Sequence, residues 1–263
     1  ARSIPPDDSH IFCTPEQIEE EYSSIMDMVL KFYATVGMQF KASLSFRDPK
    51  TPEKYLGDES LWQEAQAKLE SIAKKGGFAY TIVEGDAAFY GPKIDFIATD
   101  ALGRGHQLAT GQLDFVQPSR FKITYVDKDG TEKTPVMIHL AIAGSLERFL
   151  SVYIEHTAGA FPFWLSPVQV KVLPVSEKHF DYARSVLKAL KDAGLRAELD
   201  DANESLGKKI RNAKTQKIPY LFVLGDKEVK ANTVTVENRT ASEGPMPLDI
   251  MVARLTAEYR DRV

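Results

Sequence analysis

The sequence has only one cysteine, Cys13, among its 263 residues. A single thiol cannot form a disulfide within the chain, and a thiol-poor sequence is typical of a reducing compartment, so we expect a cytoplasmic protein. No apolar run reaches the roughly 20 residues that a membrane-spanning helix needs, so we expect no membrane partner. The composition, with 43% hydrophobic and 27% charged residues, is that of an ordinary globular protein of one or two domains.

A strong charge of one sign is also lacking, because the net charge is only −4. This balance gives no whole-molecule attraction for nucleic acid, and a nucleic-acid partner would need a local basic patch. One stretch of ten residues offers such a patch: Lys208, Lys209, Arg211, Lys214 and Lys217. A run of charges alone is more often a solvated helix face than a nucleic-acid patch, so both interpretations stay open.

Hydrophobic periodicity predicts the elements of the first part of the chain. A helix should begin at Thr14, where Gln17 completes a capping box, and should end at Gly37. The further predictions are a strand at 40–46, a helix at 60–75, strands at 78–83, 93–99, 106–115, 121–126 and 136–141, and a helix at 146–156. Because short turns join most of these strands, we expect an antiparallel sheet.

The pattern changes after residues 161–167, a stretch with two prolines that is typical of a linker. Beyond it the sequence predicts strands at 169–174, 195–199, 220–224 and 233–236, alternating with helices at 179–193, 205–215 and 247–260. Alternating strands and helices indicate an α/β domain with a largely parallel sheet. We therefore expect two domains, residues 1–161 and 168–263, joined by a linker at 162–167.

Two histidines are candidate metal ligands. His10 follows Asp7 and Asp8 just before the first helix, and His139 lies on the strand at 136–141. Imidazole is a preferred ligand of zinc. A lone histidine after two aspartates is more often a structural hydrogen-bonding residue, so a metal site here depends on both rings converging.

Residues 89–95 form a second candidate constellation. The Gly91-Pro92 pair fixes a turn that presents Tyr90 and Lys93, and a lysine held in this way can neutralise a phosphate.

Three further polar residues are candidates for the same pocket. Gln107 and Gln112 place two amides on a neighbouring strand, and Arg148 lies in the first turn of the helix at 146–156. An arginine there can meet a nucleotide by stacking and by charge. Each residue also has a plain structural interpretation, as a sheet-surface amide or as one partner of a surface salt bridge.

Eight segments resemble one family in their order and spacing. DDSHIFC (7–13), FYGPKID (89–95), QLATGQLDF (107–115), PVMIH (135–139) and GSLERF (144–149) resemble the catalytic domain of threonyl-tRNA synthetases. PFWLSPVQV (162–170), NESLGKKIRNA (203–213) and VLGDKEV (223–229) resemble the anticodon-binding domain of that family. The resemblance covers essentially the whole chain. It implies an α+β fold in which an N-terminally truncated class II catalytic core with an antiparallel sheet precedes an α/β anticodon-binding domain.

The resemblance implies a threonine–tRNA ligase that works in two steps. Threonine is activated by ATP, with Mg²⁺, to threonyl-adenylate, and the threonyl group then passes to tRNA-Thr. Family members bind one zinc ion through a cysteine and two histidines, and threonine coordinates this ion through its amino and hydroxyl groups. The cysteine ligand is expected upstream of this sequence. The full-length protein is expected to be a homodimer, and this chain a fragment that is not fully active alone.

The resemblance also assigns roles to residues of this chain. His10 and His139 match the two histidine ligands of zinc, whereas Cys13 matches a different family position. Arg2, Lys93 and Arg148 are the candidate catalytic residues at ATP. The candidate substrate-binding residues are Asp8, Tyr90, Gln107, Gln112 and Ser145. Asn203, Arg211 and Glu228 match positions that read the anticodon.

The sequence departs from the family pattern at four positions. Ile4 and Pro6 replace a larger side chain against adenine and a glutamine, respectively, while Leu140 often appears as arginine. Glu237 stands where an anticodon-contacting arginine is common, and a negative charge there would repel phosphate. These changes keep an alternative open, a non-catalytic synthetase-like RNA-binding paralogue. A ligase for proline or glycine would need no metal, and the two histidines argue against it.

Overall fold

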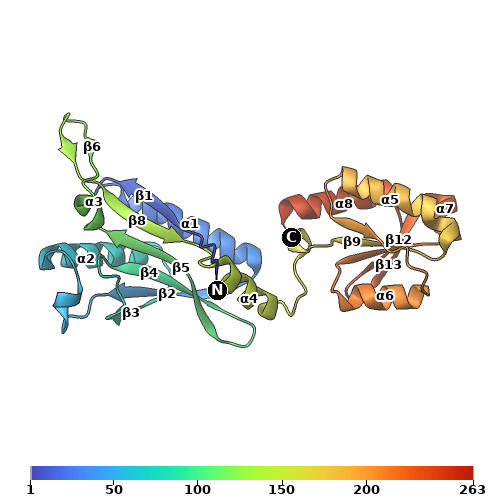
Figure 1. Ribbon diagram of the computed structural model, residues 1–263, viewed down its shortest axis with the longest axis horizontal. Helices are drawn as coiled ribbons and strands as arrows, with labels where there is room; N and C mark the ends of the chain where they lie inside the picture. Colours follow the sequence, from blue (N-terminus) through green and yellow to red (C-terminus); the bar gives the residue numbers. More distant parts are fainter. Residues whose placement is uncertain (1, 263) are drawn as a thin grey trace. The chain divides into compact units, whose positions relative to one another are not determined.

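The computed structural model describes residues 2–262 and divides into two compact units, one ending at His156 and one beginning at Thr157 (Figure 1). Each unit has its own sheet. Within the described residues, no helix is both long and apolar enough to cross a membrane.

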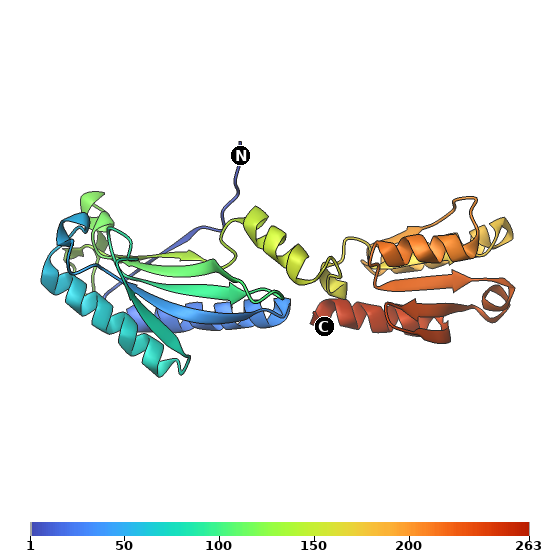
Figure 2. The same ribbon diagram turned by 90° about the horizontal axis from the view of Figure 1, so that it is seen from below.

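The first unit is built on a six-stranded sheet with the order β1-β8-β5-β4-β2-β3. Its strands are β1 (Ser9–Cys13), β2 (Gln39–Phe46), β3 (Tyr80–Glu84), β4 (Lys93–Thr99), β5 (Gly105–Asp114) and β8 (Val136–Ala141). Its longer helices are α1 (Ile18–Val36), α2 (Glu59–Lys75) and α4 (Leu146–His156), and a short 3-10 turn, η1, spans Pro52–Lys54. Helices α1 and α2 cover one face of the sheet (Figure 2).

Alternation along β4 shows why only one face is covered. Ile94, Phe96 and Ala98 are at most 1% exposed and pack on the covered side, whereas Lys93 and Asp95 project from the other face. On the covered face, the buried hydroxyl of Tyr22 in α1 donates a hydrogen bond of 3.1 Å to the carbonyl oxygen of Gly111 on β5. The uncovered face is therefore left to polar side chains.

Three predictions for the first unit need correction. Helix α1 ends at Val36, capped by Gly37 with φ of 68°, and begins at Ile18 rather than at Thr14. Gln17 Oε1 accepts a hydrogen bond from the Thr14 amide, as the capping box predicts, but residues 14–17 form a turn that precedes the helix. Strand β3 pairs with β2 in parallel, because α2 lies between them in the chain.

The strand predicted at 121–126 is mostly absent. After a one-turn helix, α3 (Gln117–Arg120), residues 121–124 form a turn, and only β6 (Tyr125–Val126) pairs, in a small hairpin with β7 (Glu132–Lys133). Lys122 lies in the left-handed region, with φ of 56°, which interrupts an extended strand.

The second unit has a five-stranded sheet with the order β10-β9-β11-β12-β13. Strands β9 (Val170–Pro174), β10 (Ala197–Leu199) and β11 (Tyr220–Leu224) are parallel, and β12 (Thr233–Asn238) and β13 (Ser242–Pro247) continue the sheet antiparallel. Its helices are α5 (Phe180–Asp192), α6 (Leu206–Thr215), α7 (Asp226–Ala231) and α8 (Leu248–Asp261), with 3-10 turns η2 (Phe163–Leu165) and η3 (Glu177–His179). The sheet is thus mixed rather than largely parallel, and both α7 and β13 escaped prediction.

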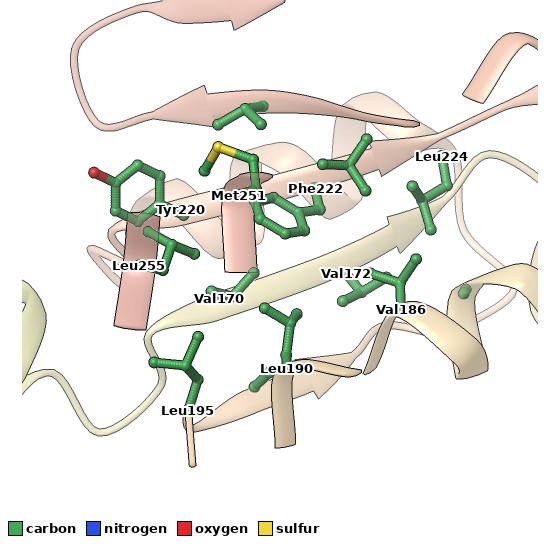
Figure 3. Packing of buried hydrophobic residues seen from close by; sticks show 14 of the residues in the cluster. Val170, Val172, Val186, Leu190, Leu195, Tyr220, Phe222, Leu224, Met251 and Leu255 are labelled. Atoms are coloured by element: carbon green, nitrogen blue, oxygen red, sulfur yellow. The ribbon is translucent and has the colours of Figure 1, made fainter. Parts of the chain in front are cut away.

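Alternate side chains of β9 pack on opposite faces of this sheet. Val170 and Val172 join the core that α5 and α8 complete, to which α8 contributes Met251 and Leu255 (Figure 3). Leu173 faces the other way and joins a smaller core under α6. The near-continuous apolar run of β9 is therefore the signature of a strand covered on both faces.

Residues 162–167, expected to form a linker, are packed against the second unit. Phe163 is 4% exposed and belongs to the larger core, and Ser166 is also buried. The guanidinium of Arg196 donates hydrogen bonds to the carbonyl oxygens of Trp164 and Ser166. This stretch is thus an ordered part of the second unit.

The turn at Gly91 supplies a test of packing in the first unit. A Cβ at Gly91 would lie 1.6 Å from the carbonyl oxygen of Leu113, so the turn can rest on β5 only as glycine. We expect Gly91→Ala to lower the free energy of unfolding by about 3 kcal/mol, the upper end of the usual cost of overpacking. Urea denaturation followed by the fluorescence of Trp62, in a Trp164→Phe background, measures this change in the first unit.

Gly207→Ala in the second unit is the contrasting variant, followed by Trp164 in a Trp62→Phe background, because no atom lies within 4 Å of its added Cβ and the position is helical. Alanine there should be neutral or stabilising by up to about 1 kcal/mol. An unchanged urea midpoint for Gly91→Ala would show that the turn does not sit against β5.

Candidate functional site

Five side chains form one row across the uncovered face of the first sheet. Register partners on neighbouring antiparallel strands share a face of the sheet, so a chain of partners defines a row. The row runs over β2, β4, β5, β8 and β1 in that order through Ser45, Lys93, Gln112, His139 and His10. Four of the five are residues that the sequence singles out, and their sequence numbers span 10 to 139.

The two histidines lie side by side. The ring centroids of His10 and His139 are 4.8 Å apart, and the rings are edge-on. His139 is held from behind by Asp114, whose fully buried carboxylate lies 2.9 Å from Nε2 of the ring. Because a carboxylate can only accept, Nε2 carries the proton and Nδ1 is the bare nitrogen.

Asp114 has a second task in the same place. Its other oxygen accepts hydrogen bonds of 2.9 Å from the backbone amides of Val116 and Gln117, which begin α3. The carboxylate is thereby fixed before it meets His139. A histidine oriented by a buried carboxylate is the usual arrangement behind a metal-binding imidazole.

Tyr90 lies beside the histidines on the same face of the sheet. Its ring lies 4.8 Å from the His139 ring, and its hydroxyl donates a hydrogen bond to Oε1 of Gln112. Burial, together with the charges of Asp114 and Asp8, raises the pKa of Tyr90 to about 12. The phenol therefore remains a donor throughout the physiological pH range.

His10 and His139 are suitable zinc ligands, but they supply only part of a zinc site. Among residues 2–262, no group of three or more His, Cys, Asp or Glu side chains is placed to hold a metal ion. Cys13 does not complete the pair, because it is an odd number of positions from His10 on the same strand and so faces the covered side. Burial and the charge of Glu21 raise the pKa of its thiol to about 11, so it stays protonated.

Lys93 and Gln107 both donate hydrogen bonds to one buried carboxylate, that of Asp95, which was not among the predicted site residues. Asp95 is 2% exposed and lies 2.6 Å from Lys93 Nζ and 2.7 Å from Gln107 Nε2. The only sequence signal for it is its place at the end of FYGPKID. Asp114 was missed in the same way, inside QLATGQLDF.

The segment before β1 runs beside the start of α4. Asp7 pins it there: its carboxylate accepts hydrogen bonds of 2.7 and 2.8 Å from the amides of Ile142 and Ala143. Pro6 pairs with Ser145 in an isolated bridge. Asp7 therefore aligns the chain around Asp8 with the helix that carries the candidate arginine.

Arg148 and Arg2 are both exposed. Ser145 Oγ accepts a hydrogen bond of 3.4 Å from the Arg148 amide, which places this arginine in the first turn of α4. The preceding turn needs Gly144, with φ of 67°, since an added Cβ would lie 2.7 Å from the Leu108 carbonyl oxygen. Arg148 thus lies in the first turn of α4, at the same end of the sheet as Pro6. Among the described residues, no contact fixes the Arg2 side chain.

The departures from the family pattern fall in two environments. Ile4 and Pro6 are exposed in the segment before β1. Leu140 is 5% exposed and packs on the covered face, out of the row that holds His139.

The anticodon candidates of the second unit do not line one cavity. Asn203 lines a cavity of about 450 Å³ at the carboxyl ends of β9 and β10. Arg211 lines a shallower depression along α6. Glu228 is the third residue of α7, where its two oxygens accept hydrogen bonds of 2.8 Å from the Gly225 amide and the Thr235 hydroxyl.

Burial raises the pKa of Glu228, but the hydrogen bonds from Thr235 and Gly225 outweigh burial and hold the pKa below its usual value. The side chain is therefore an ionised cap of α7. Each oxygen keeps a lone pair that can accept a further donor.

The basic run is not one open patch. Lys209 is 3% exposed, and its ammonium donates a hydrogen bond of 2.9 Å to the Asp200 carbonyl oxygen. Lys208 pairs with Glu204 at 2.6 Å, and Lys214 pairs with Glu237 at 3.0 Å. The second pair offsets the negative charge of Glu237. Arg211 and Lys217 are exposed and form no ion pair among the described residues.

Comparison with known proteins identifies the family of the chain. A family model for the tRNA synthetase class II core domain (G, H, P, S and T) matches residues 1–157, and one for an anticodon binding domain matches residues 169–258. The threonine–tRNA ligase of Thermus thermophilus is 50% identical over 263 residues, which are 99% of this chain and 40% of that protein. That of Thermotoga maritima is 47% identical over 92% of this chain and 37% of its own length.

Solved structures give the same result. The RNA binding domain of threonyl-tRNA synthetase from Cryptosporidium parvum superposes with a TM-score of 0.90 and 40% identity, covering 97% of this chain and 64% of that one. A putative threonyl-tRNA synthetase, ThrRS-1, from Aeropyrum pernix superposes with a TM-score of 0.81 and 26% identity, covering 98% and 64%. The chain spans about 40% of the length of the curated relatives it matches, as the Thermus thermophilus ligase illustrates. It belongs to the threonyl-tRNA synthetase family of class II aminoacyl-tRNA synthetases.

Proposed function

We propose that this chain carries part of the active site and the anticodon-binding domain of a threonine–tRNA ligase. The observation that supports the proposal most is the row from Lys93 to His10, which brings a phosphate-binding cation and two metal-binding rings onto one sheet face. We assign residues 1–161 to the catalytic core and 168–263 to the anticodon-binding domain. The whole protein would act as a cytoplasmic homodimer.

His10 and His139 are the zinc ligands in this proposal. Their adjacency and the Asp114 carboxylate behind His139 support it, and a further ligand would come from outside the described residues. When bound, the ion would coordinate the amino and hydroxyl groups of threonine as a Lewis acid. Asp8, whose carboxylate is 3.9 Å from the His10 ring nitrogen, would accept a hydrogen bond from the threonine hydroxyl. Valine has no hydroxyl to offer, which gives a physical route to specificity.

Charge at the reacting phosphate would be met by Lys93, Arg148 and Arg2. Adenylate formation places the threonine carboxylate in line with the α-phosphate of ATP, which is supplied with Mg²⁺, and negative charge on that phosphate must be neutralised. Tyr90, Gln112 and Ser145 would position the substrate, since Tyr90 fixes the Gln112 amide by its hydroxyl hydrogen bond.

The second unit would bind the anticodon of tRNA-Thr. Open α/β sheets bind ligands at the carboxyl ends of their parallel strands, and Asn203 lines a cavity there. Arg211 would supply a contact to phosphate, and Glu228 an acceptor for a base.

Zinc binding by the full-length protein tests the metal site. Isothermal titration should show one zinc ion per chain, and both His10→Ala and His139→Ala should abolish binding. Asp114→Asn should weaken zinc binding by roughly ten- to a hundredfold, because its amide donates to Nε2 and moves the ring proton to Nδ1. His156→Gln, in α4, is the control and should bind zinc as the wild type does. Loss of zinc in the control, or its retention in His10→Ala, would contradict this site.

Binding of a stable adenylate analogue tests the substrate pocket. The sulfamoyl analogue of threonyl-adenylate, in which a sulfamate stands for the phosphate, should bind more tightly than its valyl counterpart. Lys93→Met should weaken both analogues by roughly tenfold to a hundredfold, the usual worth of a charged hydrogen bond. Lys31→Met, on the exposed side of α1, should have no effect. RNA binding without binding of either analogue would instead favour the non-catalytic paralogue.

An anticodon stem-loop of tRNA-Thr tests the second unit. Arg211→Ala should reduce affinity and lower the slope of log K against log salt concentration by about 1, because one phosphate contact is lost. Lys188→Ala removes an exposed lysine of α5 and is the matched control. Equal affinity of the wild type for a stem-loop with an altered anticodon would contradict anticodon recognition.

A further inference from the structure

Asp95 is the most densely bonded side chain of the uncovered sheet face. Its carboxylate is 2% exposed and accepts hydrogen bonds from four side chains on three strands. The donors are Lys93 at 2.6 Å, Ser45 at 2.7 Å, Gln107 at 2.7 Å and Thr110 at 2.8 Å. An ionised carboxylate has about four acceptor sites, so these donors fill it.

This arrangement fixes which end of the Gln107 amide faces the pocket. A carboxylate accepts only, so the Gln107 amide must turn its NH₂ group toward Asp95. Its Oε1 has no partner within residues 2–262, and the residue is exposed. Gln107 therefore presents an acceptor.

Gln112 presents the opposite polarity. Its Oε1 accepts a hydrogen bond from the Tyr90 hydroxyl, which leaves its NH₂ group for a ligand. The two amides are thus set in opposite senses, one by a carboxylate and one by a phenol.

Lys93 is held by the same carboxylate. Its side chain is 11% exposed, and the ammonium lies between Asp95 at 2.6 Å and Asp86 at 3.3 Å. An ammonium has three N–H groups, so one remains for a ligand. The Asp95 charge also offsets the cost of holding a mostly buried cation.

We propose that Asp95 is a positioning residue of the adenylate pocket. It fixes Gln107 as the acceptor for an N–H or O–H donor of the bound aminoacyl-adenylate, and it aims the Lys93 ammonium at the phosphate. This inference rests on the proposed function, which places Lys93 and Gln107 at the substrate.

Asp95→Asn tests the proposal with Thr110→Val as the control. Thr110→Val removes one of the four hydrogen bonds to Asp95. Asp95→Asn removes the charge and replaces one of the two acceptor oxygens by an NH₂ group, so that either Gln107, on Oδ1, or Lys93, on Oδ2, loses its acceptor. Asp95→Asn should weaken binding of the threonyl-sulfamoyl analogue by roughly tenfold to a hundredfold, and Thr110→Val by less than about threefold. In a Lys93→Met, Gln107→Met background, Asp95→Asn should cost no further affinity, because Asp95 acts through these two residues. If Asp95→Asn lowered the affinity only by destabilising the fold, the loss of affinity would persist in that background.

Two variants of the ligand identify which of its groups donates a hydrogen bond to the Gln107 Oε1 atom. One analogue lacks the amino group and the other lacks the ribose 2′-hydroxyl. The wild type should bind one of them more weakly than the parent analogue, and Gln107→Met should remove that difference. Equal binding of all three analogues by the wild type would overturn the acceptor role.

A measurement on the wild type covers the case in which Asp95→Asn does not fold. The Gln107 side-chain amide should show a proton signal shifted downfield by its bond to Asp95, and analogue binding should leave it unchanged. A Gln107 NH₂ signal that shifts when the analogue binds would overturn this inference and leave the proposed function standing. Equal effects of Asp95→Asn and Thr110→Val would do the same. Failure of the wild type to bind any analogue would overturn the proposed function and this inference together.

Discussion

The candidate site depends on the strand register of the first sheet. His10 and His139 meet because β1 and β8 pair with these two residues opposite each other. A slip of one residue would turn one ring to the face that α1 and α2 cover, away from the other ring. The register is held by the buried apolar residues on that face, such as Leu140 and Ile138. The hydrophobic core therefore determines the chemistry of the polar face.

Three carboxylates, of which Asp95 and Asp114 are buried and Asp7 is half-buried, translate this register into defined donors and acceptors. Asp114 sets the tautomer of His139, Asp95 sets the polarity of Gln107, and Asp7 ties the segment before β1 to the start of α4. Burying such groups is unfavourable unless their acceptor sites are filled, and in each case backbone amides or polar side chains fill them. The charges that define the site are thus also part of its framework.

Much of the fold could be predicted from local patterns. The bounds of β4, β8, β11 and α4 agree with the prediction, because Gly and Pro residues flank these elements and mark their ends. The strand expected at 121–126 failed because apolar residues in a short hairpin imitate alternation, and β13 was missed because its Gly and Pro residues suit only an edge strand. The family motifs pointed to most candidate side chains, and the structure shows which of them share a face. The roles of Asp95 and Asp114 could not be predicted, since a buried carboxylate and a solvated one look the same in sequence.

Cys13 ends the strand that carries His10, yet its thiol lies under the sheet, 5% exposed and with its pKa raised to about 11. A sulfhydryl that is both covered and protonated reacts slowly with alkylating reagents while the sheet is closed. Since the chain has no other cysteine, the rate of alkylation would report how often β1 detaches from its neighbours. Cys13 is therefore a native probe for local opening at the β1 edge of the first sheet.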